Sequence, residues 1–287
     1  MPLTNANKIL NDARGQRYGV LSLLGGDLAM VAGLIGAAEA KRAPLILVYN
    51  EDVTPKIRME LAIPMLVKAA EGTDVPVAVI LDHGRDLNHV TRAIRLGCSS
   101  VMYDGSALPY EENVARTAEV VEVAHTAGVD VEAELGSIAG SAVDLESSGP
   151  EASFTDPDVA ADFVERTGID VLAVSFGNVH GVYRGEPQLD LERVRAIHRK
   201  VTIPLAMHGA SGLDDEDYGP IIDSGISKVC YYTAMGIGAS ESIRDFLDQA
   251  GEGNAVYHEI QSLAVDYFQV ETARLIDLVG CSNTVPL

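Results

Sequence analysis

Short apolar runs alternate with amphipathic stretches along the whole chain. Among the amphipathic stretches, Leu28–Lys41 and Glu112–Ala127 have the spacing and alanine content of helices, and Asp156-Pro157 offers a cap followed by proline at a first helical position. Strands that alternate with helices predict an α/β protein with a parallel sheet, and eight such units predict a (β/α)8 TIM barrel. The runs expected to form its strands are Tyr18–Leu24, Leu45–Tyr49, Val77–Leu81, Ser99–Tyr103, Asp130–Glu134, Val171–Phe176, Ile203–Met207 and Lys228–Tyr231.

The length of the chain suits one such barrel. Its 287 residues have 47% hydrophobic content and can bury a sizeable core, and single α/β barrels commonly run to about 250 residues. We therefore expect residues 1–287 to form a single domain, with 252–287 as a C-terminal helical tail. The segment Val256–Leu278 has apolar faces that suit either a subunit contact or packing against the barrel.

Charge and cysteine content narrow the class of protein. The net charge of −21 is spread along the chain, which favours solubility and opposes binding to nucleic acid. Cys98, Cys230 and Cys281 are odd in number and widely spaced, which argues against a disulfide framework and against a thiolate metal cluster. No apolar run approaches the roughly 20 residues of a membrane span, and the first residues lack the features of a signal peptide. A cytoplasmic protein with no membrane partner is expected.

Three histidines are each followed by glycine, and each pair comes after an apolar run: His83-Gly84, His180-Gly181 and His208-Gly209. A lone histidine at a strand end is usually satisfied by a backbone carbonyl. In a barrel, however, the ends of strands three, six and seven meet at one mouth, where active sites are built. Three imidazoles with one open position are typical of a catalytic zinc site. The sequence therefore favours a metal site at the mouth.

Three carboxylates share the same predicted rim. Asp82 precedes His83, Asp104 follows strand four, and Glu134 ends strand five. Each suits either the metal chemistry or a structural role as a helix cap or salt-bridge partner. The other histidines lack this context, and we expect surface or packed positions for His89, His125 and His198 in helices and for His258 in the tail.

With these residues in place, the chain resembles the class II, metal-dependent ketose-bisphosphate aldolases, closest to the tagatose-bisphosphate and fructose-bisphosphate aldolases. The resemblance extends over nearly the whole length. The motifs that carry it are 81–84 (LDHG), 103–106 (YDGS) with Pro109 and Glu112-Asn113, 131–136 (VEAELG), 155–157 (TDP), 163–168 (FVERTG), His180-Gly181 with 185–187 (GEP), and 208–212 (HGASG).

The resemblance implies roles for individual residues. His83, His180 and His208 would hold zinc, and Asp82 would exchange a proton with the aldehyde-derived oxygen. Asp104 and Glu134 would bind a second metal or support the metal-binding residues. Four further residues would bind the phosphorylated ketone: Gly181, Gly209, Ser211 and Thr233. A second divalent or a monovalent cation and a homodimer or homotetramer are also implied. Glycine-rich turns that point backbone amides at the mouth suit a phosphate independently.

Departures from the family pattern leave the substrate open. An Ala-Phe-Asn stretch becomes 23–27 (LLGGD), and Asn50 stands near the place of a serine. The run that carries the presumed donor base becomes 139–144 (AGSAVD), where Asp144 or Glu146 would have to take over. After strand eight, Cys230 replaces an asparagine that holds the ketone. Tolerated drift and changed specificity are both consistent with these changes.

The leading hypothesis is a zinc-dependent lyase that reversibly cleaves a phosphorylated ketose into dihydroxyacetone phosphate and an aldehyde through an enediolate. In that chemistry zinc acts as a Lewis acid on the ketone, and a neighbouring carboxylate moves the proton. One alternative is a diverged metal-dependent aldolase or epimerase that acts on a different carbonyl compound, including a non-phosphorylated one. Another is a non-catalytic barrel subunit of an aldolase complex.

Overall fold

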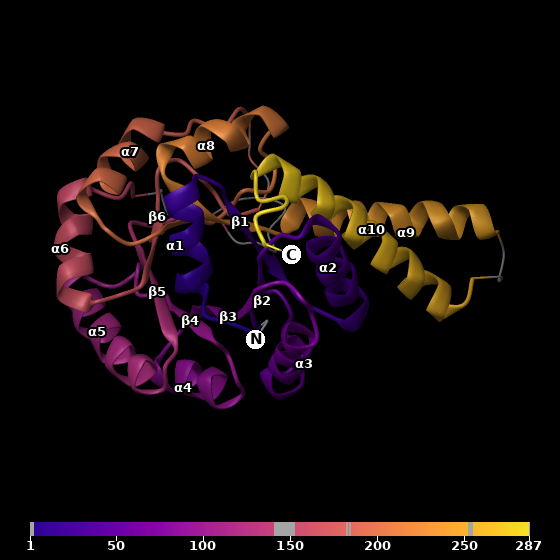
Figure 1. Cartoon of the computed structure of the whole chain (residues 1–287), viewed down its shortest axis with the longest axis horizontal. Coiled ribbons are helices and arrows are strands. Elements are labelled where there is room, and N and C mark those ends of the chain that lie inside the picture. The colour runs from indigo at the N-terminus through magenta and orange to yellow at the C-terminus, as the bar shows by residue number, and fades with distance from the viewer. Residues whose placement is uncertain (1–2, 141–152, 182, 184, 252–254, 287) are drawn as a thin grey trace.

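Eight parallel strands close into a barrel in the order β1 to β8, with β8 paired to β1 (Figure 1). The computed structural model describes residues 3–140, 153–181, 183, 185–251 and 255–286. The strands are β1 Val20–Leu24, β2 Leu45–Tyr49, β3 Val77–Gly84, β4 Ser100–Tyr103, β5 Asp130–Leu135, β6 Val171–Val174, β7 Leu205–Met207 and β8 Ile226–Tyr231. The helices are α1 Ala6–Gln16, α2 Leu28–Lys41, α3 Met59–Glu71, α4 Leu87–Arg95, α5 Tyr110–Thr126, α6 Pro157–Thr167, α7 Leu191–Lys200, α8 Tyr218–Ser224, α9 Thr233–Ala250 and α10 Tyr257–Leu278, with a short 3-10 turn at Asp215–Asp217. The predicted barrel is confirmed.

Strand β3 ends later than expected, and the difference concerns a site residue. It was expected to stop at Leu81, but it continues to Gly84, which pairs with Tyr103 after a register shift that begins at Leu81. His83 lies inside this irregular end and has a positive φ of 47°, a conformation that is uncommon for residues other than glycine. The histidine therefore belongs to the strand end and does not follow it.

Two helix boundaries match their sequence signals, whereas α5, expected at Glu112–Ala127, spans Tyr110–Thr126. Helix α2 spans the expected Leu28–Lys41, and α6 begins at Pro157, where the Asp156 side chain accepts hydrogen bonds from the N–H groups of Asp158 and Val159. A side-chain acceptor satisfies amides that have no partner within the helix. His89, His125 and His198 lie on α4, α5 and α7 as expected.

Helix α1 covers the amino-terminal end of the barrel, where it lies across the opening in Figure 1. The N–H of Ala6 donates to Ser100 Oγ at 2.9 Å, and Asn5 Nδ2 donates to Asp130 Oδ1 at 2.8 Å, at the starts of β4 and β5. These bonds close that end with backbone and polar contacts. The opposite, carboxyl end of the strands is the one that forms a cavity.

The C-terminal helices α9 and α10 extend beyond the barrel beside α2 (Figure 1). Helix α10 packs closely on α2, because a Cβ at Gly33 would lie 2.6 Å from the Val265 carbonyl oxygen. Phe268 and Leu275 are buried in this contact region, whereas Val270 is 72% exposed. The apolar face of 256–278 therefore packs in part against the barrel helices.

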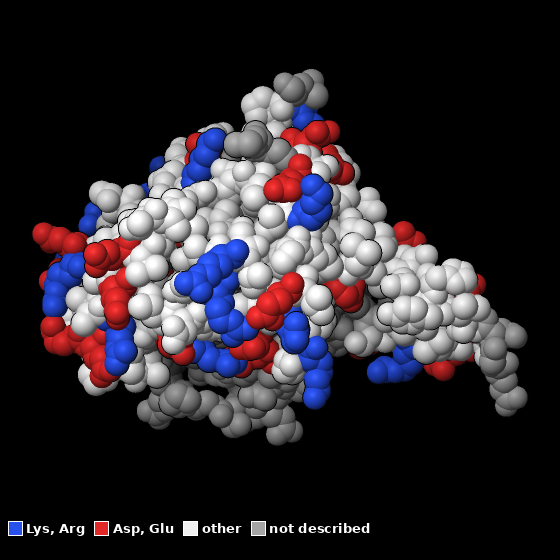
Figure 2. All heavy atoms as spheres, turned by 90° about the horizontal axis from the view of Figure 1, so that it is seen from below, with Lys and Arg blue, Asp and Glu red and all other residues white. Residues whose placement is uncertain are grey.

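Two surface properties follow from the described residues. Within them no helix is long and apolar enough to cross a bilayer. Figure 2 shows Lys and Arg side chains interspersed with Asp and Glu on the face seen from below. The excess negative charge therefore does not gather into a single acidic patch on that face.

Candidate active site

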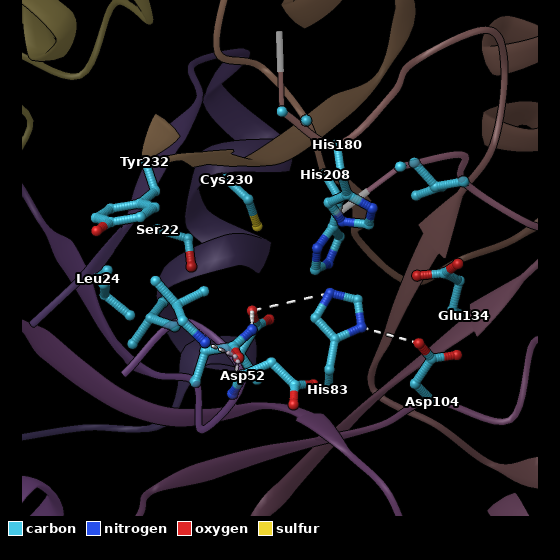
Figure 3. Close-up of a pocket in the computed structure, with 18 of the residues that line it drawn as sticks. Ser22, Leu24, Asp52, His83, Asp104, Glu134, His180, His208, Cys230 and Tyr232 are labelled. Atoms are coloured by element: carbon cyan, nitrogen blue, oxygen red, sulfur yellow. Dashed lines mark hydrogen bonds and ion pairs between the residues drawn. The ribbon is translucent and has the colours of Figure 1, made fainter. Parts of the chain in front are cut away.

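A cavity of about 510 Å³ opens at the carboxyl ends of the barrel strands. Its walls combine charged groups from β3, β5 and the loop after β4 with the apolar side chain of Leu24 on β1 (Figure 3). The cavity also contains the ends of the loops after β6, β7 and β8. It is the position at which barrel enzymes place their catalytic groups.

The three glycine-followed histidines meet inside this cavity. The ring centroids lie 5.2 Å apart for His83 and His180, 4.9 Å for His83 and His208, and 5.6 Å for His180 and His208. One nitrogen atom from each ring lies within 4.8 Å of the others. Three elements far apart in sequence thus place three potential metal ligands together.

Hydrogen bonds orient two of these rings. His83 Nδ1 lies 2.8 Å from Asp104 Oδ2, and His208 Nε2 lies 2.9 Å from Glu132 Oε1. Each contact occupies one ring nitrogen and leaves the other for a ligand, as in carboxylate–histidine–metal arrangements. His180 Nε2 is buried and has no hydrogen-bond partner among the described residues. A buried nitrogen in this state, with two oriented imidazoles beside it, fits a divalent transition metal.

The carboxylate behind His208 belongs to a buried ion pair. Glu132 Oε2 accepts from Lys228 Nζ at 2.6 Å, and both side chains are buried inside the barrel. Burial alone would raise the pKa of Glu132 and lower that of Lys228, but the neighbouring groups outweigh it. Lys228 and His208 lower the pKa of Glu132, and Cys230 and Glu132 raise that of Lys228. Neither Glu132 nor Lys228 was expected to have a role in the site. The sequence contained one signal for Glu132: strand alternation in 131–136 points Glu132 to the same face of β5 as Glu134.

Asp82 lies beside the histidines with one oxygen free. Asn50 Nδ2 donates to Asp82 Oδ2 at 3.0 Å, whereas Asp82 Oδ1 is buried without a hydrogen-bond partner among the described residues. Burial acts to raise the pKa of this carboxyl, but the charges of His83, His208 and Lys228 lower it to about 2. Asp82 is therefore an ionised acceptor in a cavity, which suits proton transfer.

Asp104 and Glu134 form a second possible ligand group with His83. Asp104 Oδ1 accepts from the N–H of Ser106 at 3.0 Å and from its hydroxyl at 2.7 Å, so this carboxylate orders the loop after β4 and does not cap a helix. Glu134 Oε2 is buried without a hydrogen-bond partner among the described residues. Burial and the charge of Asp104 raise the pKa of Glu134 to about 7. Asp104 and Glu134 both line the cavity at the mouth of the barrel, where they were expected.

The histidines differ in their affinity for protons. Burial opposes protonation of His83, but Asp82 and the hydrogen bond to Asp104 raise its pKa to about 9. Burial and the charges of His83 and His208 lower the pKa of His180 to about 3. In the metal-free protein a proton therefore competes with a cation at His83 but not at His180.

All the residues expected to bind a phosphorylated ketone lie around the same cavity: Gly181, Gly209, Ser211 and Thr233. Gly209 has a φ of 73°, and a Cβ there would lie 1.9 Å from the carbonyl oxygen of Val179. The loops after β6 and β7 thus touch through backbone alone, which requires glycine. Ser211 Oγ accepts from the N–H of Tyr232 at 3.1 Å and ties the loop after β7 to the end of β8.

The departures from the family pattern fall at distinct places. Leu24, Asn50 and Cys230 line the cavity, whereas Asp27 caps α2 by accepting from the N–H of Met30 at 2.9 Å. Asp27 is thereby explained without a role in the site. The candidate donor bases at positions 144 and 146 lie outside the described residues.

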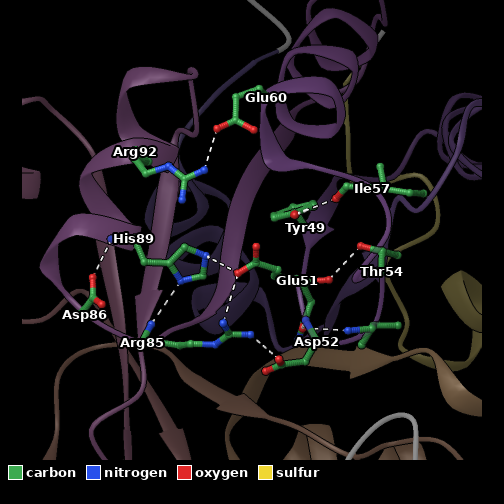
Figure 4. A network of polar contacts seen from close by, with 12 residues as sticks. Tyr49, Glu51, Asp52, Thr54, Ile57, Glu60, Arg85, Asp86, His89 and Arg92 are labelled. Atoms are coloured by element: carbon green, nitrogen blue, oxygen red, sulfur yellow. Dashed lines mark hydrogen bonds and ion pairs between the residues drawn. The ribbon is translucent and has the colours of Figure 1, made fainter.

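A polar network fixes the rim beside Asn50 (Figure 4). Glu51 Oε2 lies 3.3 Å from Arg85 NH1 and 3.4 Å from His89 Nε2, and the N–H of Arg85 donates to His89 Nδ1 at 3.3 Å. Arg85 also pairs with Asp52. Burial lowers the pKa of His89, so this ring is neutral and structural, as expected. Among the described residues, Arg85 is the one Lys or Arg that lines the cavity, and two carboxylates balance its charge.

Comparisons with known proteins agree with this geometry. A family model described as class-II fructose-bisphosphate aldolase matches residues 4–284. The uncharacterized protein YdjI of Escherichia coli (strain K12) is 38% identical over 239 residues, which cover 83% of this chain and 86% of the relative. A probable fructose-bisphosphate aldolase of Bacillus subtilis (strain 168) is 37% identical over 250 residues, with 86% and 87% covered. The crystal structure of the YdjI aldolase from Escherichia coli K12 has a TM-score of 0.88 at 33% identity and covers 99% of this chain and 100% of that chain.

Proposed function

We infer the reaction from one premise: the chain belongs to the class II fructose-bisphosphate aldolase family. It is an enzyme, an aldolase that breaks and forms a carbon–carbon bond. We propose that its metal is zinc and that it cleaves a phosphorylated ketose reversibly into dihydroxyacetone phosphate and an aldehyde. The observation that carries this proposal is the group of three histidines beside the free oxygen of Asp82.

His83, His180 and His208 would hold the cation, because each offers one nitrogen to the same point in the cavity. A divalent cation there supplies a Lewis acid that polarises the ketone and stabilises the negative charge that develops during bond cleavage. Asp104 orients His83 through its ring nitrogen, and Glu132 does the same for His208. Asp104 and Glu134 would either support the metal-binding histidines or bind a second divalent or a monovalent cation.

Asp82 would move the proton of the aldehyde half. In the cleavage direction its free Oδ1 would accept the proton from the hydroxyl group whose oxygen becomes the aldehyde oxygen. In the condensation direction it would return that proton. The bond from Asn50 holds Oδ2 and thereby directs Oδ1 toward the substrate.

The phosphate would bind on the side of the cavity formed by the loops after β6, β7 and β8. Gly181 and Gly209 line the cavity there, Ser211 joins two of the loops, and Thr233 begins α9. Backbone amides at such turns and helix starts attract an anion without needing lysine. This arrangement suits a chain whose overall charge repels anionic substrates.

The donor half-reaction tests the proposal without knowledge of the aldehyde. Zinc-loaded protein is incubated with dihydroxyacetone phosphate in deuterated water, and loss of the reactive carbon-bound proton is followed by NMR. We expect exchange that stops when the metal is chelated and returns when zinc is restored. Zinc-loaded protein that does not exchange this proton would contradict the assigned donor.

The assembly, domain organisation and location are proposed on the same basis. We propose a homodimer or homotetramer, to be checked by light scattering of the purified protein. A single domain over 1–287, with 252–287 as its C-terminal tail, predicts one cooperative unfolding transition in calorimetry. The cytoplasmic location stays a prediction. Among the described residues, no specific contact favours a diverged aldolase or epimerase for another carbonyl substrate, or a non-catalytic barrel subunit.

A further inference from the structure

Ser22 lies on β1 with its side chain turned into the cavity. It is 2% exposed, and its Cα pairs with Ile46 on one side and with Cys230 on the other. Figure 3 shows its hydroxyl and the Cys230 sulfur pointing into the same space near the histidines. Strand alternation places Leu24 on the same face, nearer the mouth.

The Ser22 hydroxyl is buried and has no hydrogen-bond partner among the described residues. Burying such a group costs free energy, and nearly all buried polar groups in folded proteins find a partner. Other buried barrel serines follow that rule. Ser100 Oγ accepts from the N–H of Ala6 at 2.9 Å, and Ser175 Oγ donates to the carbonyl oxygen of Ser137 at 3.0 Å.

The surroundings of Ser22 indicate what partner it lacks. Leu24 and Val48 line the same wall and offer no polar atom, and the Cys230 thiol is only a weak donor. Within the described ranges, the other unpartnered atoms of the cavity are Asp82 Oδ1, Glu134 Oε2 and His180 Nε2, which suit protons and cations. Ser22 is the member of this set that is neither a carboxylate nor an imidazole. A neutral oxygen of the substrate, a hydroxyl or a carbonyl, matches it.

Strand β8 indicates which half of the substrate reaches this wall. Cys230 is the register partner of Ser22, and the chain continues from it to Thr233, which is proposed to bind the phosphate of the ketone. The ketone half would therefore extend from Thr233 past Cys230 toward the histidines. Ser22 faces the middle of that path.

We propose that Ser22 is a substrate-binding residue whose hydroxyl hydrogen-bonds a neutral oxygen of the ketone half. The inference rests on the proposed aldolase function, because it assigns the ligand to that site. The Ser22 hydroxyl would be a stronger hydrogen-bonding group for the substrate than the Cys230 thiol on the same wall. The unsatisfied hydroxyl in the free protein is then the group that the substrate satisfies.

Ser22→Ala tests this with two readouts. The apparent KM for dihydroxyacetone phosphate in the deuterium-exchange reaction should rise about 3- to 10-fold, the loss expected for one neutral hydrogen bond, while bound zinc is unchanged. The thermal midpoint of the metal-free variant should be no lower than that of wild type, because no protein hydrogen bond is lost. Ser22→Cys, with nearly the same size and a weaker donor, should give an intermediate KM.

Ser100→Ala is the matched control, since it removes a buried hydroxyl that does have a partner. It should lower the thermal midpoint and leave the KM unchanged. An unchanged KM in Ser22→Ala, or a midpoint lowered as much as in Ser100→Ala, would overturn the inference while exchange by wild type upheld the proposed function. Absence of exchange in zinc-loaded wild type would overturn both.

Discussion

Asn50 and Asp82 are joined by a hydrogen bond of 3.0 Å from the amide nitrogen to Oδ2. The amide oxygen of Asn50 accepts from the N–H groups of Asp52 at 2.9 Å and Val53 at 3.3 Å, so the orientation of the amide is fixed. A loop after β2 is thereby coupled to the carboxylate proposed to move the proton. Asn50 acts on the chemistry through Asp82 and is a positioning residue.

Replacing Asn50 with leucine should slow cleavage more than binding. Leucine has a similar shape but removes the hydrogen bond to Asp82 and the acceptor of the Asp52 and Val53 N–H groups, so we expect kcat to fall about 10- to 100-fold. KM and bound zinc should change little. Because Asp82 serves the aldehyde half, deuterium exchange of the ketone donor should stay near the wild-type rate. Equal losses in cleavage and exchange would show that Asn50 serves the whole site.

Asp82→Asn should remove most cleavage activity while zinc remains bound. Loss of a general acid–base group typically costs about 10²- to 10⁴-fold in rate. The measurement is steady-state cleavage, with zinc determined by atomic spectroscopy on the same sample. Turnover near that of wild type would show that another group moves the proton. Asp27→Asn is a suitable control, because Asp27 caps α2 and does not line the cavity.

His180→Ala should lose its zinc. The Nε2 atom of His180 is buried without a partner in the described part of the chain, and the low pKa of the ring keeps it unprotonated as a ligand. Loss of a ligand should weaken metal binding by more than the roughly 10- to 100-fold that changes behind a ligand cause. His258→Ala, an exposed position on α10, is the control and should bind zinc like wild type. Full zinc binding by His180→Ala would exclude it as a ligand.

Lys228→Met should destabilise the protein in a pH-dependent way. Removing one partner of a buried ion pair leaves Glu132 with the His208 ring but without the Lys228 cation, and costs about 3–5 kcal/mol. Lys228 is one of the groups that lower the pKa of Glu132 against the effect of burial, so its loss should raise that pKa relative to wild type. A carboxyl whose folded pKa is raised loses stability as pH rises, so the deficit should be larger at pH 8 than at pH 5. Urea unfolding at both values measures it, and a deficit independent of pH would contradict this explanation.

Thiol labelling should separate the three cysteines. Burial raises the pKa of Cys98 and Cys281 to about 12, so both remain protonated and unreactive at pH 8, whereas Cys230 faces the cavity. We expect Cys230 to react first in the native protein, and the other two to react only after denaturation. Mass spectrometry of labelled peptides identifies the order. Labelling of Cys98 before Cys230 would contradict the described burial.

The sequence was sufficient for the barrel because its signals are local. An apolar run such as Leu45–Tyr49 and a cap such as Asp156 act through neighbours in the chain, and both were predicted at their observed positions. The His-Gly pairs were informative for the same reason, once the topology brought the strand ends together. The predicted order of the strands was enough to place the three His-Gly pairs at the same mouth of the barrel.

Other features depend on contacts that sequence spacing does not encode. The bond between Asn50 and Asp82 joins two strand ends, and the Glu132–Lys228 pair spans the barrel interior from β5 to β8. The irregular end of β3 at His83 depends on its pairing with β4. The unpartnered hydroxyl of Ser22 is visible only when its surroundings are known.

The backbone contact between Gly209 and Val179 means that the spacing of two ligands is built into the scaffold. His180 follows Val179 and His208 precedes Gly209, so neither loop can shift without the other. A cation would bind to ligands that already lie close to their final positions, so the protein would need little reorganisation. Cation exchange should then be governed by how readily the ion sheds its water, and any side chain at position 209 would separate the two ligands before it disturbed the barrel.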